Sequence, residues 1–463
     1  MKYILMLVCG VAVLMLGVAV MAQEDACPVL VADALELAEE VCEQASSSEL
    51  CYGHFVLEAE PQLGADNFKF DEPGDIESVT QVQSLRLSAM DAVEDIWGVA
   101  VMRVRAVLTG TMEPEDVVFL LFGDVVVENA ITLTEVTVIS DGNIRAEASA
   151  NSALVDVVAA GEQVIADGRT ADTAWIRVRR DNDQFQGWIA ASLLELTPAV
   201  AGLPVADAAD DLESQLLYGA MQAFYFRSGM NDAPCQEAPN SGLLIQTPEG
   251  EAEVTLLMNE ANIQLRATAY VQAQAGENMT VYVIEGEATI EADGEERTLI
   301  SGTSLTVPLN ADGEVDGPPT EPEPYDMTQL QALPVNLLDR PVDVADALDQ
   351  TAGVPLSGDW NFNWSVTQAT CADGQTVDFA TENPRTSIRV DDGGDSFVML
   401  LTRYSRDETG AYRTVFTDAS GNVHTYTVQV SSLDRLSGSA QIDYLFGCSL
   451  TVPFELRLVS AAS

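Results

Sequence analysis

Two histidines, His54 and His424, limit the catalytic chemistry open to this 463-residue chain. They exclude a three-histidine zinc site, and the sequence has neither a His-Glu-x-x-His segment nor a Gly-x-Ser-x-Gly nucleophile elbow. We interpret both histidines as structural or surface residues. The sequence therefore predicts a protein that is not an enzyme and that holds no metal and no cofactor.

Carboxylates are abundant, with 73 acidic against 21 basic residues and a net charge of −52. A pair of carboxylates can hydrolyse a glycosidic bond, so a two-carboxylate glycan hydrolase is the enzymatic alternative; the short predicted strands argue against it. The acidic turns at 181–183 and 391–395 lack the spacing of a calcium loop and are predicted to be solvated hairpin tips. The net charge repels nucleic acids and anionic lipid surfaces, so we expect neither as a partner.

The first residues predict export. Lys2 precedes an apolar run from Ile4 to Val20. Val20-Met21-Ala22 then offers small or apolar side chains for a signal peptidase, and an acidic segment follows. This pattern is typical of a cleaved signal peptide over residues 1–22, with an uncleaved single-helix anchor as the alternative. We expect an extracellular or cell-surface protein without a membrane segment in its mature chain.

Cysteine usage agrees with export, because an even number of cysteines follows the leader. Cys27 and Cys42 would stand at the two ends of one predicted helix, about 22 Å apart, which is too far for a disulfide. Two connectivities remain for the first four cysteines: Cys42–Cys51 with Cys27–Cys235, or Cys27–Cys51 with Cys42–Cys235. The nine-residue separation of Cys42 and Cys51 favours the first. Cys371 and Cys448 would pair with each other, which adds roughly 4 kcal/mol of stability in the chain-entropy model.

Length and periodicity predict a mainly β protein made of several small β domains with one short N-terminal helix. Residues 313–327 combine four prolines with acidic side chains and are predicted to be extended and solvated. The predicted domains are a signal peptide (1–22), a helix with a β domain (23–138), three further regions discussed below (139–197, 210–310 and 351–463), and an acidic Pro-rich linker (311–350).

Residues 139–197 carry the most specific pattern. Asn143-Ile144-Arg145 is followed by Gly161, then by Trp175-Ile176-Arg177-Val178, and finally by Gly187-Trp188-Ile189. This order resembles the bacterial SH3-like (SH3b) domain, although Glu147-Ala148 replaces the Gly-Pro usual after the opening Arg. The resemblance implies a small five-stranded barrel that binds an envelope glycan, a peptide or a protein. Trp175 and Trp188 are the candidate ligand-binding residues, and packing within the small barrel is the alternative role for both.

Residues 210–310 read as strands, with a hairpin turn at Asp293-Gly294. The strand from Thr280 to Ala292, followed by Gly302-Thr303, resembles FecR-type domains. That resemblance implies a β fold only, because no cytoplasmic segment precedes the leader to carry the signalling role of FecR regulators.

The last region, 351–463, opens with Gly358-Asp359-Trp360 and continues as alternating strands, including one predicted from Phe397 to Thr402. With Arg457 on the last strand, it resembles a lipocalin-like barrel. The resemblance implies that Arg457 packs over Trp360; both are candidate ligand-binding residues, with a packed cation–π pair as the structural alternative. The predicted function is a non-catalytic secreted binding protein, and a carrier of a small apolar ligand in the C-terminal barrel is the alternative.

Overall fold

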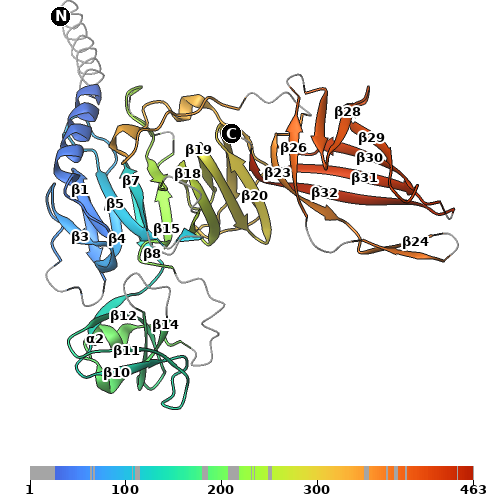
Figure 1. Cartoon of the computed structure of the whole chain (residues 1–463). Coiled ribbons are helices and arrows are strands. Elements are labelled where there is room, and N and C mark those ends of the chain that lie inside the picture. Colours follow the sequence, from blue (N-terminus) through green and yellow to red (C-terminus); the bar gives the residue numbers. More distant parts are fainter. Residues whose placement is uncertain are drawn as a thin grey trace, which may run out of the picture. The chain divides into compact units, whose positions relative to one another are not determined.

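The structure is a computed structural model, and β-strands dominate it (Figure 1), which confirms the mainly β prediction. The predicted leader lies outside the described residues. Among the described residues, no helix is both long and apolar enough to span a membrane. The described residues are 27–461, without 63–64, 66–67, 107, 110–114, 180–185, 207–217, 231, 234, 249–252, 349–353, 372–373, 380–383, 392–393 and 446.

The chain forms two compact units. The first contains Met1–Val281, Val307–Gly317 and Met327–Val344, and the second contains Tyr282–Thr306, Pro318–Asp326 and Ala345–Ser463.

A large sheet is the centre of the first unit. Its strand order is β2-β4-β8-β15-β17-β18-β16-β7-β5-β1-β3, with β6 paired to β17. All of these pairs are antiparallel except β15 with β17. The strands are β1 (Glu49–His54), β2 (Leu57–Pro61), β3 (Ile76–Ser78), β4 (Val82–Leu87), β5 (Val99–Ala106), β6 (Leu108–Thr109), β7 (Glu115–Phe122), β8 (Val125–Asn129), β15 (Ala223–Ser228), β16 (Gly242–Gln246), β17 (Glu253–Met258) and β18 (Ala261–Ala273).

Two distant chain segments build this sheet together. Strand β8 pairs with β15, so that Asn129 lies opposite Phe224, and β7 pairs with β16. The structure therefore differs from the predicted separation into a 23–138 domain and a 210–310 domain. Alternation within each segment indicates strands but not their partners, so one shared sheet and two separate sheets give the same local pattern. The residues between β8 and β15 form a module inserted into the sheet.

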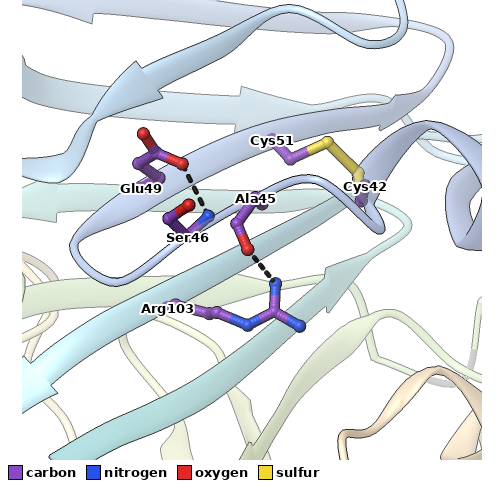
Figure 2. The surroundings of a disulfide bond; sticks show 6 residues. All are labelled: Cys42, Ala45, Ser46, Glu49, Cys51 and Arg103. Atoms are coloured by element: carbon purple, nitrogen blue, oxygen red, sulfur yellow. Dashed lines mark hydrogen bonds between the residues drawn. A yellow bond between two sulfur atoms is a disulfide. The ribbon is translucent and has the colours of Figure 1, made fainter.

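Residues 27–42 are helical and pack on β1, where Gly53 lies close to Ala38 and leaves no room for a side chain. The helix is followed by a disulfide between Cys42 and Cys51. Between the two cysteines the Ser46 amide donates to Glu49, and Arg103 of β5 donates to the Ala45 carbonyl at 3.0 Å (Figure 2). The second disulfide joins Cys27 to Cys235, which gives the first of the two connectivities left open by the sequence.

The inserted module is a second sheet with the order β11-β10-β14-β13-β12-β9. Its core contains apolar side chains from most of its strands, including Ile144, Val164, Ile176 and Ile189, which are all buried. Its elements are β9 (Thr134–Thr137), β10 (Gly142–Arg145), β11 (Leu154–Val158), β12 (Gln163–Arg169), β13 (Trp175–Arg179), β14 (Gln186–Ala190), the 3-10 turn Ala191–Leu193 and the short helix α2 (Pro198–Gly202).

The long strand β19 (Asn278–Ala292) continues from the first unit into the second and forms a hairpin there with β20 (Glu295–Ile300). β21 (Thr303–Pro308) pairs with the short β22 (Glu323–Pro324), and Thr320 donates from its amide to the Thr306 carbonyl. The Pro-rich stretch predicted as a solvated linker is thus partly held against β21. Prolines exclude a helix but permit an extended edge segment, which the composition does not distinguish from a free linker.

The rest of the second unit is a closed barrel of antiparallel strands, joined in the order β23-β26-β27-β28-β29-β30-β31-β32. A hairpin of β24 (Gln368–Thr370) and β25 (Thr376–Asp378) follows β23, and the disulfide Cys371–Cys448 holds it. The barrel strands are β23 (Gly358–Trp364), β26 (Arg385–Val390), β27 (Ser396–Met399), β28 (Thr402–Arg406), β29 (Tyr412–Thr417), β30 (Val423–Val430), β31 (Arg435–Asp443) and β32 (Ser449–Ala461).

The run Phe397–Thr402, predicted as one strand, turns back on itself in the structure. Met399 pairs with Thr402, so Leu400 and Leu401 are the only residues of the loop, and both have positive φ angles of 50° and 63°. Two-residue hairpin loops with this backbone favour Asn-Gly or Asp-Gly, because residues other than Gly, Asn and Asp are strained at positive φ. The predicted turn Asp293-Gly294 has the same backbone, with φ angles of 50° and 75°.

Replacing Leu400-Leu401 by Asn-Gly should stabilise the barrel by about 1 kcal/mol, because it removes left-handed strain from two leucines. Native-state hydrogen exchange of the β27 and β28 amides measures the change. The reciprocal substitution Asp293→Leu with Gly294→Leu should destabilise the β19–β20 hairpin to a similar extent. Unchanged or faster exchange in the Asn-Gly variant would contradict the strain assigned to this turn.

Candidate functional site

The inserted module places both of its predicted site tryptophans on one face of its sheet. Ile176 and Ile189 pair across β13 and β14 and lie in the core. Because side chains alternate along a strand, Trp175 and Trp188 face the opposite side. Trp175 lies opposite Ala190, and Trp188 lies opposite Arg177, so the two indoles are diagonal neighbours.

The two tryptophans differ in exposure. Trp188 is fully buried, with Arg177 opposite it on β13 and Arg145 opposite it on β10. Trp175 is only partly buried. Its backbone is fixed by Thr170, whose amide donates to the Trp175 carbonyl at 2.9 Å and whose hydroxyl accepts from the Trp175 amide at 3.1 Å. Trp188 is therefore a packing residue of this face, and Trp175 is the aromatic side chain that a ligand can reach.

Beside the tryptophans lies a charged cluster of Asp167, Arg177 and Arg179. Arg177 donates to Asp167 at 2.9 Å, and the Nε atom of Arg179 lies 3.8 Å from the same carboxylate. The side chains of Asp167 and Arg179 are only 7% and 8% exposed. Burial lowers the pKa of Arg179, the negative charge of Asp167 opposes that change, and the positive charge of Arg177 adds to it. A second guanidinium nitrogen of Arg179 donates to the Tyr218 carbonyl.

Sequence reasoning missed this cluster. Asp167 stands ten residues before Arg177, and a bulge shifts the register of β12 against β13 between Ala166 and Gly168. Only that shift brings the carboxylate to the arginines. The one available signal was the concentration of arginines on β13, in a chain with few basic residues.

In the barrel, the predicted pair of Trp360 and Arg457 is wrong. Trp360 is fully buried and lies opposite Leu458 on β32, which is also buried. Arg457, one residue away, therefore points to the outside, where it donates to Glu455 at 2.7 Å. The spacing along the sequence did not show this, because a shift of one residue in register moves a side chain to the other face.

Aromatic rings occupy the barrel interior. Phe397 stacks on Tyr404 at 4.8 Å and Phe362 stacks on Phe454 at 4.7 Å between ring centroids. Tyr426 links the two pairs, at 6.4 Å from Tyr404 and 5.7 Å from Phe454. Because the barrel's own side chains contact one another across this interior, the structure does not favour a deep cup for a small apolar ligand.

The remaining candidates are placed as follows. His54 is buried and bonded through Nδ1 to the Trp97 carbonyl, and His424 contacts Asp418 at 3.1 Å. The acidic turn 181–183 lies outside the described residues. In the other acidic turn, Asp391 binds Ser396 and Arg403, while residues 392–393 lie outside the described residues.

Comparison with known families identifies the inserted module. The bacterial SH3 domain family matches residues 140–195, which agrees with the predicted 139–197. No curated protein and no solved structure matches the chain. The resemblances to FecR-type domains and to lipocalins stay predictions.

Substituting Asp167→Asn should destabilise the SH3 module by about 3 kcal/mol, because it removes the carboxylate from the buried Arg179 and the partly buried Arg177. Hydrogen exchange of the β12 and β13 amides measures this loss. The matched control is Glu135→Gln on β9, where the carboxylate is exposed. Equal exchange in both variants would show that the cluster does not hold the module together.

Proposed function

We propose that this chain is a non-catalytic, exported binding protein whose SH3 module attaches it to a ligand of the bacterial cell envelope. The observation that carries the proposal is the SH3 family match over residues 140–195, in a module that presents a partly exposed Trp175 on its outer face. The non-catalytic part of the proposal is supported by the sequence, which has two histidines and no nucleophile elbow.

Export is supported by two independent features of the sequence and the structure. The apolar run after Lys2 has the pattern of a secretory leader. All six cysteines that follow it are paired in disulfides, which persist in oxidising compartments. An SH3 module of this kind is consistent with a protein at or outside the cell surface.

The chemistry of the face favours an envelope glycan or a peptide as the ligand. An aromatic ring offers a flat apolar surface to a sugar ring or to a peptide side chain. The neighbouring cluster adds guanidinium groups to this face, since Arg177, whose side chain is 15% exposed, and Arg179 both lie against Asp167. A ligand that carries a carboxylate beside an apolar surface matches both features.

The variant Trp175→Ala should bind purified cell wall roughly tenfold more weakly, because truncating an aromatic contact residue commonly costs 1–2 kcal/mol or more. Co-sedimentation of the full chain with cell-wall material measures retention. The control is Leu154→Ala, an exposed side chain on β11.

Trp188→Ala is the control for unfolding, because it should unfold the module and also abolish retention. Trp175→Ala should weaken retention while the module stays folded. Retention of the native chain no higher than that of an unrelated acidic protein would overturn the proposal. So would full retention by a folded Trp175→Ala variant, which would place binding elsewhere.

A further inference from the structure

The tip of the β27–β28 hairpin is the most exposed apolar point of the described chain. Leu400 is 61% exposed and Leu401 is 101% exposed. Both leucines also adopt left-handed backbone angles that disfavour their side chains. They therefore weaken the hairpin locally, while Leu401 buries no apolar surface in return and Leu400 buries only a minor part of its own.

Another two-residue hairpin of the chain shows what such a loop contributes when it serves the fold. Between β17 and β18 the loop is Asn259-Glu260, again with positive φ at both residues. Asn259 is buried, accepts from the Phe226 amide and donates to the carbonyls of Phe226 and Gly313. Leu400 and Leu401 make no comparable contact, so the fold itself does not account for them.

The strands next to this tip are basic. β26, β27, β28 and β29 contain five arginines and no Asp or Glu, although acidic residues outnumber basic ones by 73 to 21 in the whole chain. Four of these arginines are exposed on the outer wall: Arg385, Arg389, Arg403 and Arg413. Arg406 differs, since its guanidinium lies over the Tyr412 ring.

Two of the arginines lie close behind the tip, and the turns on either side of this hairpin carry their carboxylates at the other ends of the strands. Arg389, Val398 and Arg403 lie side by side on adjacent strands. Arg403 follows Leu401 by two residues, which is about 7 Å along a strand. The carboxylates of Asp391, Asp395 and Asp407 belong to turns at the opposite ends of these strands.

At the tip's own end of the barrel, Asp418 lies in the β29–β30 turn and Asp443 is the last residue of β31. This end of the barrel therefore carries arginines on the β26–β29 strands and carboxylates at the β29–β30 and β31–β32 connections. Even there, Arg403 shares its charge with Asp391, and Ser387 donates to Asp359.

We propose that the Leu400-Leu401 tip inserts into an anionic lipid surface, with Arg389 and Arg403 at the level of the head groups. An apolar tip with cations about 7 Å behind it matches the depth profile of a bilayer interface, where apolar groups reach 5–10 Å below the phosphates. A protein pocket for the two leucines would not require Arg389 and Arg403 close behind them. This inference concerns a surface separate from the SH3 module and goes beyond the proposed function.

The net charge of −52 is compatible with this contact. At physiological salt the Debye length is about 8 Å, so a surface responds chiefly to the charges that lie close to it. The total charge should slow the approach of the protein to an anionic surface, while the local arginines determine the docked contact. Lipid binding should consequently be weak at low salt and orientation-dependent.

Vesicle flotation tests the proposal with the chain that begins at Gln23, because the apolar leader would bind lipid by itself. The vesicles contain either phosphatidylcholine alone or phosphatidylcholine with about 30% phosphatidylglycerol, at about 0.1 M salt. We expect binding to the mixed vesicles at least about fivefold above binding to the neutral ones. Replacing Leu400-Leu401 by Asn-Gly should reduce that binding at least about tenfold while the barrel stays folded.

Two matched controls complete the test. Leu154→Asn with Leu196→Gly removes two exposed leucines outside the barrel and should leave vesicle binding unchanged. Arg389→Gln with Arg403→Gln should abolish the preference for anionic vesicles, whereas Arg227→Gln on β15 should not.

Absence of binding to both vesicle types overturns the proposal, as does full binding by the Asn-Gly variant. If vesicles fail but cross-linking from position 401 captures one specific protein, the tip contacts a protein and the lipid assignment is wrong. A failed vesicle test leaves cell-wall retention through Trp175 unaffected, so the two proposals fail separately.

Discussion

The pairing of β8 with β15 is the contact on which the arrangement of the first unit depends. Residues 130–222 lie between these two strands, 93 residues in all. Asn129 and Phe224 nevertheless lie opposite each other in the ladder. Directly opposed residues of antiparallel strands are only about 5 Å apart. Everything between the two strands, including the whole SH3 module, therefore enters and leaves the sheet at nearly one point. The Cys27–Cys235 disulfide covalently closes a larger loop that contains this one, with a sequence separation of 208.

This insertion separates the tasks of the chain. The large sheet and its disulfides hold together residues from both sides of the module, while the module keeps its own apolar core. Its outer face is then free to carry groups that the fold does not need to expose, such as Trp175. The barrel shows the same division: rings fill its interior, whereas Leu400 and Leu401 are exposed at a strained turn. Exposure that weakens a fold locally is best explained by a contact made outside it.

Charge is distributed in the same way. The chain total of −52 describes the behaviour of the whole molecule in solution, but it does not describe the Arg177–Asp167–Arg179 cluster or the arginine-rich wall of the barrel. Basic residues gather in both places, although the whole chain has only 21 of them. A prediction of partners from net charge alone therefore misses the surfaces that differ from the average.

Much of the local structure could be predicted from the sequence. Ordered motifs such as Trp175-Ile176-Arg177-Val178 identified the SH3 module, and Asp293-Gly294 identified a hairpin, because these residues act through local backbone geometry. Pairing between distant segments was not predictable, and neither was the register that turns Arg457 away from Trp360. The turn at Leu400-Leu401 was missed because an apolar run gives no local signal for a loop. The bulge that brings Asp167 to its arginines is likewise a property of the folded sheet.

Excision of the module tests the central claim most directly. Residues 134–205 would be replaced by a short Gly-Ser linker, and both the sheet and cell-wall retention would be measured. The account predicts that the β8 and β15 amides keep their protection from hydrogen exchange, that Cys27–Cys235 still forms, and that retention on cell wall is lost. Persistent retention without the module, or loss of protection throughout the sheet, would contradict it.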